Sequence, residues 1–377
     1  MLRTFFLLSM PWLCLSACIN TEPPSNPFRE PINYAVGESP SHMVTADLNA
    51  DAVVDIIIAN SQDNNISILF GKNDGSFPNI RTLKTGRQPR WVVAGDFNED
   101  QKIDLGVVNN GGDNIVILLN QGGGNFLRSM RIKTKRSPQS ATVNDFNGDG
   151  HLDIAIVSRF DYLLILLGDG SGRFKRKKEI DTGAIPTDII SGDFNGNGLI
   201  DLLTANNGTP SSDLLFFWGK GDGNFVEGTH YRTGMNPLAV ITADFNKDSY
   251  PDLLAVNGMG DSLTLFVSNA EGKGKGKGFE KVSDFGADGG PTSVIAHDFN
   301  GDTLLDLVVT NTRSSNISYL TGKKDGRFNH PPLNLYTGKA PFYIVTGDFN
   351  QDGRMDIAVT NNNEASMSVL LAKNADF

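Results

Sequence analysis

The chain has 377 residues, of which 39% are hydrophobic and 20% charged, a composition typical of folded proteins and not of disordered ones. Its 33 Lys and Arg against 43 Asp and Glu give a net charge of −10, which argues against a nucleic-acid-binding protein. Both cysteines, Cys14 and Cys18, lie near the N-terminus, so the remaining residues are expected to fold without disulfides or cysteine-bound metal.

The N-terminus has the features of an export signal. A single arginine precedes an apolar stretch at 5–15 that is too short to span a bilayer as a helix. It ends in Leu15-Ser16-Ala17-Cys18, which resembles a bacterial lipobox and predicts that the signal peptide 1–17 is removed and Cys18 is lipidated. Residues 18–27 would then tether the protein to the bacterial cell envelope, with the outer membrane or cell surface favoured. An ordinary secretory signal cleaved nearby is the alternative.

A sevenfold repeat occupies residues 28–377. The phrase Asp-Phe-Asn-x-Asp, followed four residues later by another Asp, recurs with minor changes at intervals of 48 to 54 residues. A proline stands seven residues before every copy and fixes the register of the repeat. Such regular self-similarity indicates one array of small structural units rather than separate domains.

Each repeat predicts four short strands. In order, they are a run after the proline (such as 91–94), a run after the acidic phrase (55–60), an apolar run (66–70) and, beyond a glycine-rich hairpin (71–77), a more polar strand. Four antiparallel strands in about 50 residues, repeated seven times, predict an all-β chain folded as a seven-bladed β-propeller.

The two ends of the array are complementary. Residues 28–40 match the fourth strand of a repeat, and the last repeat reaches its third strand at 367–371 without a fourth. The N-terminal strand is therefore expected to pair with the last blade, which closes the ring and removes two open sheet edges.

The acidic phrases predict calcium sites. Each has the pattern Asp-x-Asn-x-Asp-x-x-x-Asp, except that Asn replaces the middle Asp in the fourth. Oxygens at positions 1, 3, 5 and 9, with a backbone carbonyl at 7, suit Ca²⁺, which takes about six to eight oxygen ligands. Crowding 20 carboxylates into seven loops also favours bound cations. For single loops, Asx turns that bind no metal are the alternative.

Up to seven Ca²⁺ ions are expected, and position 2 of each loop should lie in the core. The predicted ligands are Asp47, Asn49, Asp51, Asp55, Asp96, Asn98, Asp100, Asp104, Asp145, Asn147, Asp149, Asp153, Asp193, Asn195, Asn197, Asp201, Asp244, Asn246, Asp248, Asp252, Asp298, Asn300, Asp302, Asp306, Asp348, Asn350, Asp352 and Asp356. Position 6 is expected to form a left-handed turn, which favours glycine. Only the third, fourth and seventh loops have glycine there, and the third and seventh also keep three carboxylates, so these two are predicted to bind best.

Two phrases, 145–157 and 117–126, are similar to FG-GAP-like (VCBS) repeats, which are related to the calcium-loop blades of integrin α-subunit propellers. The resemblance covers residues 28–377 and implies a calcium-bearing propeller exported to the cell surface or periplasm. Because the family includes adhesion modules, lectins and domains attached to enzymes, the resemblance does not name a ligand.

The face opposite the acidic loops is the predicted ligand face. Aromatic rings combined with arginines there would suit a sugar or a peptide, although they could instead fill the central channel or pack between blades. The candidates are Arg90, Trp91, Arg159, Arg313, Phe342 and Tyr343, together with His42 and Asp161.

Two basic runs, at 128–136 and 173–178, fall in the fourth strands of the second and third repeats. Contact with anionic envelope polymers and protection of the sheet edges against unwanted pairing are both compatible with them.

Nothing in the repeats indicates a nucleophile with its base or a buried acid–base pair, so no catalytic residue is predicted. The expected function is that of a non-catalytic, calcium-binding envelope lipoprotein, a binding or adhesion module for a protein or glycan ligand. A calcium-dependent polysaccharide lyase or other carbohydrate-active enzyme is the alternative, and a purely structural assembly subunit is a third possibility. The membrane is an expected partner through the lipid anchor, and nucleic acid is not.

Overall fold

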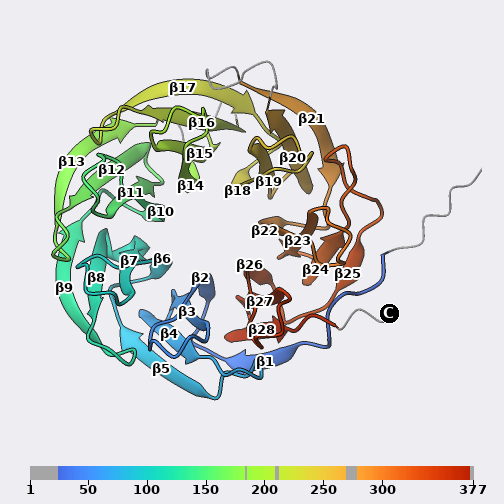
Figure 1. Ribbon diagram of the computed structural model, residues 1–377, viewed down its shortest axis with the longest axis horizontal. Helices are drawn as coiled ribbons and strands as arrows, with labels where there is room; N and C mark the ends of the chain where they lie inside the picture. Colours follow the sequence, from blue (N-terminus) through green and yellow to red (C-terminus); the bar gives the residue numbers. More distant parts are fainter. Residues whose placement is uncertain (1–23, 183–184, 209–211, 269–277, 374–377) are drawn as a thin grey trace, which may run out of the picture.

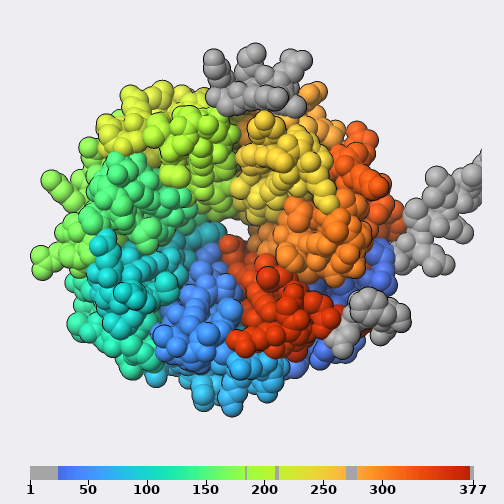
Figure 2. All heavy atoms as spheres, viewed as in Figure 1, coloured from blue at the N-terminus to red at the C-terminus, as the bar shows by residue number. Residues whose placement is uncertain are grey.

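Seven four-stranded sheets form a ring around a central opening (Figure 1, Figure 2). The computed structural model describes residues 24–182, 185–208, 212–268 and 278–373. Neighbouring strands within each sheet are antiparallel, and in the first six blades they follow chain order from the centre to the perimeter. The only helical segment in the described residues is the 3-10 turn η1 (Asn110–Gly112). The predicted all-β, seven-bladed propeller is confirmed.

Each blade has an inner strand, two middle strands and an outer strand. From the centre outward, blades 1 to 4 consist of β2 (Pro40–Ala46), β3 (Asp55–Asn60), β4 (Asn65–Phe70) and β5 (Asn79–Lys84); β6 (Pro89–Gly95), β7 (Asp104–Asn109), β8 (Asn114–Asn120) and β9 (Phe126–Lys133); β10 (Pro138–Asn144), β11 (Asp153–Ser158), β12 (Tyr162–Gly168) and β13 (Phe174–Asp181); and β14 (Pro186–Gly192), β15 (Asp201–Asn207), β16 (Ser212–Gly219) and β17 (Phe225–Arg232). Blades 5 to 7 consist of β18 (Pro237–Ala243), β19 (Asp252–Asn257), β20 (Ser262–Ser268) and β21 (Phe279–Gly286); β22 (Pro291–His297), β23 (Asp306–Asn311), β24 (Asn316–Leu320) and β25 (Leu333–Leu335); and β26 (Pro341–Gly347), β27 (Asp356–Asn361), β28 (Ser366–Leu370) and β1 (Ile32–Ala35).

Burial explains the composition of the strands. The second strand of a blade is covered on both faces by the neighbouring blades, and all six residues of β3 are buried. Such a strand is nearly continuous in apolar residues, since neither face meets water. The fourth strand forms the perimeter (Figure 1), and most residues of β13 are exposed, which accounts for its polar sequence.

The ring is closed by the N-terminal strand, as predicted. β1 pairs antiparallel with β28 in the register Ile32 to Val369, and a further bridge joins Phe28 to Ala372. Phe28 is fully buried and packs edge-to-face on Phe299, with ring centroids 5.2 Å apart. Both sheet edges that an open array would expose are thereby paired.

Aromatic contacts join neighbouring blades. In five blades, the Phe at loop position 2 packs edge-to-face on the Phe that precedes or begins the fourth strand of the next blade. Ring centroids are 5.3 Å apart for Phe97 and Phe174, and 5.6 Å for Phe349 and Phe77, which spans the closure. Position 2 is buried in every blade but the sixth, where it is half-buried, so its predicted place in the core is confirmed.

The predicted signal peptide, the lipobox and Cys18 lie outside the described residues. So does most of the predicted tether. No helix in the described ranges has the length and apolarity needed to cross a bilayer.

Candidate functional site

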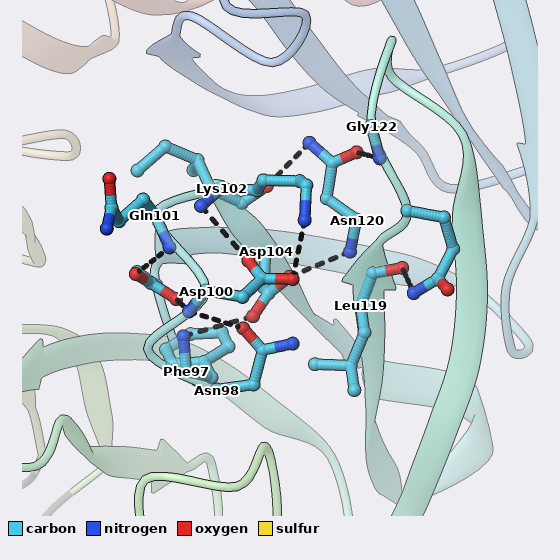
Figure 3. Close-up of polar contacts among 12 residues, drawn as sticks. Phe97, Asn98, Asp100, Gln101, Lys102, Asp104, Leu119, Asn120 and Gly122 are labelled. Atoms are coloured by element: carbon cyan, nitrogen blue, oxygen red, sulfur yellow. Dashed lines mark hydrogen bonds and ion pairs between the residues drawn. The ribbon is translucent and has the colours of Figure 1, made fainter.

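The acidic loops lie at one end of the blades, each between the first and second strands, and the second loop shows their shared geometry (Figure 3). At position 1, Asp96 accepts hydrogen bonds from the backbone N–H groups of Asp100 (N···O 3.1 Å) and Gln101 (2.7 Å). At position 3, the Asn98 side-chain oxygen accepts from the same Asp100 N–H, at 3.2 Å. Two side-chain oxygens that share one donor lie close together. These three bonds recur in all seven loops.

Position 9 has a different role. Asp104 is fully buried, and its two oxygens accept hydrogen bonds from the backbone N–H groups of Phe97 (3.0 Å) and Asn120 (2.7 Å; Figure 3). One carboxylate thus ties the loop to the end of the third strand, and all seven blades repeat this pair of bonds. Burial, assisted by the charges of Asp100 and Asp96, raises the pKa of Asp104 to about 6 against the opposing effect of the two amide hydrogen bonds.

The predicted calcium ligands therefore fall into two groups. Side chains at positions 1, 3 and 5 gather at the mouth of each loop, whereas the position-9 carboxylate is directed to backbone amides. Among the described residues, no group of three or more His, Cys, Asp or Glu side chains could hold a metal ion. The donors at the mouth, two carboxylates and an amide oxygen in six of the loops, are all hard oxygens, a set that fits Ca²⁺ and not a soft metal.

In two loops a cation at position 7 pairs with the position-5 Asp, which the pattern of Asp and Asn did not reveal. Lys102 at position 7 forms an ion pair with the position-5 Asp100 (N···O 2.8 Å; Figure 3), and Arg354 pairs in the same way with Asp352 (2.7 Å). The third loop has His151 at position 7, but this side chain bonds to Glu99. Since an ammonium or guanidinium competes with a metal ion for the same oxygen, the third loop is a better candidate than the seventh.

The backbone of the loops is left-handed at two positions. Position 6 has φ between 65° and 87° in all seven loops, so the predicted turn there is confirmed. Position 4, which was not predicted, has φ between 56° and 79°. Thr303, a β-branched residue at position 6 with φ 72°, is held in a conformation that such residues rarely adopt.

On the opposite face, three predicted ligand-face aromatics come together. The inner strands run towards the acidic loops, so their first residues lie at the other end of the channel. The His42 ring stacks on Trp91, with centroids 3.6 Å apart, and lies 4.3 Å from Tyr343. The three side chains come from blades 1, 2 and 7, which are neighbours around the channel (Figure 1). Burial, and then the charge of Arg90, lower the pKa of His42 well below its ordinary value, so this ring is neutral at pH 7.

Charged groups lie beside this aromatic cluster. Burial and the neighbouring Arg159 lower the pKa of Arg90, while the carboxylate of Asp188 opposes the change. Asp188 is buried and accepts hydrogen bonds from the Ser140 hydroxyl (2.8 Å) and the Val240 N–H (3.2 Å). Sequence reasoning missed Asp188 and Ser140. The available signal was their position, two residues after the proline, which is also that of His42.

The remaining candidates do not join the cluster. Arg313 forms an exposed ion pair with Asp261 in the neighbouring blade. Phe342 is half-buried, and its backbone carbonyl accepts a hydrogen bond from the Thr292 hydroxyl (2.7 Å). The channel-mouth cluster is therefore defined as His42, Arg90, Trp91, Arg159, Asp188 and Tyr343.

The fold and its loops define a seven-bladed β-propeller with one acidic loop in every blade. The FG-GAP-like repeat matches six overlapping segments, 47–107, 96–156, 145–204, 193–255, 244–309 and 298–359, each beginning at the first Asp of a loop. The chain belongs to this repeat family. No curated protein matches its sequence.

Several solved structures share the fold. BBS1N in complex with ARL6DN superposes with a TM-score of 0.66 at 11% identity, covering 93% of this chain and 98% of that one. A functionally unknown protein from Desulfotomaculum acetoxidans gives 0.61 at 12% identity, with coverage of 85% and 95%. A putative 6-phosphogluconolactonase from Bacteroides uniformis gives 0.57 at 16% identity, with coverage of 79% and 86%. At these identities the similarity concerns the fold alone.

Proposed function

We propose that the protein is a non-catalytic, calcium-binding module that is exported and held at the bacterial cell envelope by a lipid on Cys18. It binds a protein or glycan ligand on the face opposite the acidic loops. The observation that carries the proposal is the channel-mouth cluster, in which three aromatic rings from neighbouring blades meet at one end of the channel and the charges of Arg90 and Arg159 are close enough to influence each other.

The cluster has the chemistry of a recognition site. The exposed parts of Trp91 and Tyr343 offer apolar surface to a sugar ring or an apolar side chain. Arg90 and Arg159 offer donors to a carboxylate or a carbonyl, and Asp188 is already engaged by Ser140. BBS1N, which shares the fold, was solved in complex with ARL6DN, and this precedent supports a protein partner.

Calcium would stabilise the loops on the other face. The carboxylates at positions 1 and 5 and the amide oxygen at position 3 would hold the ion, which supplies the positive charge that neutralises them. The position-9 carboxylate is not among these proposed ligands, because both of its oxygens already accept hydrogen bonds from backbone amides. Each occupied site adds about 2.7 kcal/mol to the free energy of unfolding when free calcium is about 100 times the Kd.

Thermal unfolding of the purified domain in chelator and in millimolar calcium tests the metal proposal. We expect a higher melting temperature with calcium and little effect of magnesium, which prefers a rigid octahedron with several waters. Identical melting curves in chelator and calcium would overturn it. Replacement of Cys18 by Ser tests the anchor, because the variant should leave the membrane fraction.

Crosslinking and pull-down from intact cells, combined with a glycan-retention assay, test the ligand face. Trp91→Ala and Arg159→Ala should both lower retention at least tenfold, because each removes a ligand contact worth about 1.4 kcal/mol or more. Tyr336→Ala is the matched aromatic control, since Tyr336 is exposed but lies on the outer part of blade 6. Depolymerisation of a retained polysaccharide would contradict the non-catalytic proposal and favour a lyase.

A further inference from the structure

The perimeter of blades 1 to 3 carries a positive charge that the other blades lack. The outer-strand segments of these blades, with the loops that follow them, contain 12 Lys and Arg against two carboxylates. The equivalent segments of blades 4 to 7 contain four Lys and Arg against six carboxylates. The segments compared are 77–88, 126–137 and 174–185 in the first group and 225–236, 279–290, 328–340 and 28–39 in the second.

These cations define the basic rim, which belongs to a protein with a net charge of −10. Its members are Arg81, Lys84, Arg87, Arg128, Arg131, Lys133, Lys135, Arg136, Lys175, Arg176, Lys177 and Lys178. Within the described part of the chain, only Lys135 and Arg176 have a carboxylate oxygen within 4 Å, and both pair with Glu179. Most of the positive charge on this surface is therefore not neutralised by the protein itself.

The basic rim is continuous from blade to blade. Arg128 of β9 donates a hydrogen bond to the Thr85 carbonyl of blade 1 (3.1 Å), and Arg176 of β13 donates to the Lys133 carbonyl of blade 2. The three outer strands follow one another along one arc of the ring (Figure 1). Lysines and arginines on adjacent strands thus form one convex surface instead of three separate patches.

Protection of sheet edges does not account for this distribution. Exposed edges are commonly kept from pairing by charged residues, lysine above all. All seven outer strands of the ring are edges, yet the outer-strand segments of β17, β21, β25 and β1 have four Lys and Arg against six carboxylates and so carry no net positive charge. A requirement shared by seven blades cannot explain a feature confined to three neighbouring ones.

We propose that the basic rim binds a flexible, linear polyanion, namely an anionic polysaccharide bearing sulfate or carboxylate groups. Guanidinium groups pair in bidentate fashion with such oxyanions, and the ammonium groups add charge. A convex arc across three blades suits a chain that bends around it, whereas a flat membrane would touch one blade at a time. Single-stranded nucleic acid usually requires a row of stacking aromatics. Among the large apolar side chains exposed in the described residues of these three blades, only Phe160 is aromatic.

Binding of dextran sulfate and of uncharged dextran of equal length, measured by fluorescence anisotropy in calcium buffer, tests the proposal. We expect binding to dextran sulfate only. If about six cations are engaged, affinity should fall about 10³-fold between 50 and 200 mM salt, because each neutralised charge releases a counterion. Polygalacturonate, which carries carboxylates, distinguishes a preference for uronates from one for sulfates.

The triple variant Arg131→Glu/Lys133→Glu/Lys177→Glu should lose at least tenfold in affinity for dextran sulfate. Its control, Lys220→Glu/Lys323→Glu/Lys324→Glu, changes the net charge equally at exposed lysines outside the basic rim and should lose less than threefold. Melting curves confirm that both variants fold. Equal losses in the two variants, or no binding by the wild type at 50 mM salt, would overturn the proposal.

Tighter binding to a charge-matched oligonucleotide or to anionic vesicles would reassign the surface to nucleic acid or membrane. The channel-mouth variants Trp91→Ala and Arg159→Ala should retain dextran sulfate, so this result is independent of the proposed ligand face.

Discussion

The two faces of the ring differ in how closely the seven blades resemble one another. On the acidic face, all seven loops have the same hydrogen bonds at positions 1, 3 and 9 and the same left-handed turns at positions 4 and 6. On the other face, the second residue after the proline differs from blade to blade: His42, Trp91, Ser140, Asp188, Ala239, Ser293 and Tyr343.

This difference separates what the fold requires from what recognition requires. A position that is identical in every blade serves a need that every blade has, such as tying a loop to the end of a strand. A position that varies cannot serve such a need, so it is available for a ligand that meets the ring in one orientation. The same reasoning applies to the perimeter, where the basic rim interrupts an otherwise weakly charged edge.

The largest loss of stability is expected when the contacts that close the ring are weakened. Phe28 is fully buried between blades 6 and 7, so Phe28→Ala should lower the free energy of unfolding by about 3–5 kcal/mol. Leu127→Ala, on the exposed perimeter, should change it by less than about 0.5 kcal/mol. Urea unfolding of both variants measures the difference, and equal stabilities would show that the ring does not depend on this closure.

Two substitutions in the third loop should separate the structural role of the position-9 carboxylate from the role of the side chains at the loop mouth. Asp153→Ala leaves the buried N–H of Phe146 and the partly buried N–H of Gly168 without acceptors and should cost about 2–4 kcal/mol. Asp149→Ala, at the exposed mouth, should cost less than about 1 kcal/mol when measured in chelator. In calcium the second variant should lose additional stability through its weakened site. If both variants lost a similar free energy of unfolding in chelator, position 9 and the loop mouth would not have the different roles assigned to them.

On the face opposite the acidic loops, His42 should make the stability of the protein depend on pH. Its folded-state pKa lies below that of the unfolded chain because of burial and the charge of Arg90. Its stabilising contribution is therefore complete above about pH 6.5 and is lost as pH falls towards the folded pKa, by up to about 1.4 kcal/mol per pH unit for one proton. The difference in unfolding free energy between wild type and His42→Gln should shrink between pH 7.5 and 5. If the unfolding free energies of the two proteins changed with pH in parallel, the lowered pKa of His42 would be contradicted.

The number of blades, the closure and the burial of position 2 could all be predicted because they depend on spacing that the sequence repeats seven times. The period fixes the blade, and the orphan strand at 28–40 has one free edge to pair with. The hard-oxygen donors at positions 1, 3 and 5 were visible for the same reason.

Other features depend on contacts that the repeat does not encode. The position-9 Asp reads as a ligand in the linear pattern, yet its oxygens meet amides about 7 residues before it and about 16 residues after it, which only the folded blade brings near. The ion pair of Lys102 with Asp100 depends on a residue type that varies between loops. The position of Asp188, two residues after the proline, matches that of His42, but the sequence does not show that this carboxylate is buried or that Ser140 of the adjoining blade lies beside it.

The smallest expected change in stability comes from backbone strain at position 6 of the sixth loop, where Thr303 replaces the favoured glycine. Thr303 adopts φ 72°, where a side chain costs about 1–2 kcal/mol relative to the right-handed region. Glycine removes that strain but adds about 0.5–1 kcal/mol of backbone entropy to the unfolded state. Thr303→Gly should therefore stabilise the protein by about 0.5–1 kcal/mol, measured by urea unfolding in chelator. The reciprocal change Gly353→Ala should destabilise by a similar amount, since a Cβ there meets no atom within 4 Å and only the backbone strain remains. If both variants lose stability, the Thr303 side chain, which accepts a hydrogen bond from Lys247 (2.9 Å), contributes more than its strained backbone costs.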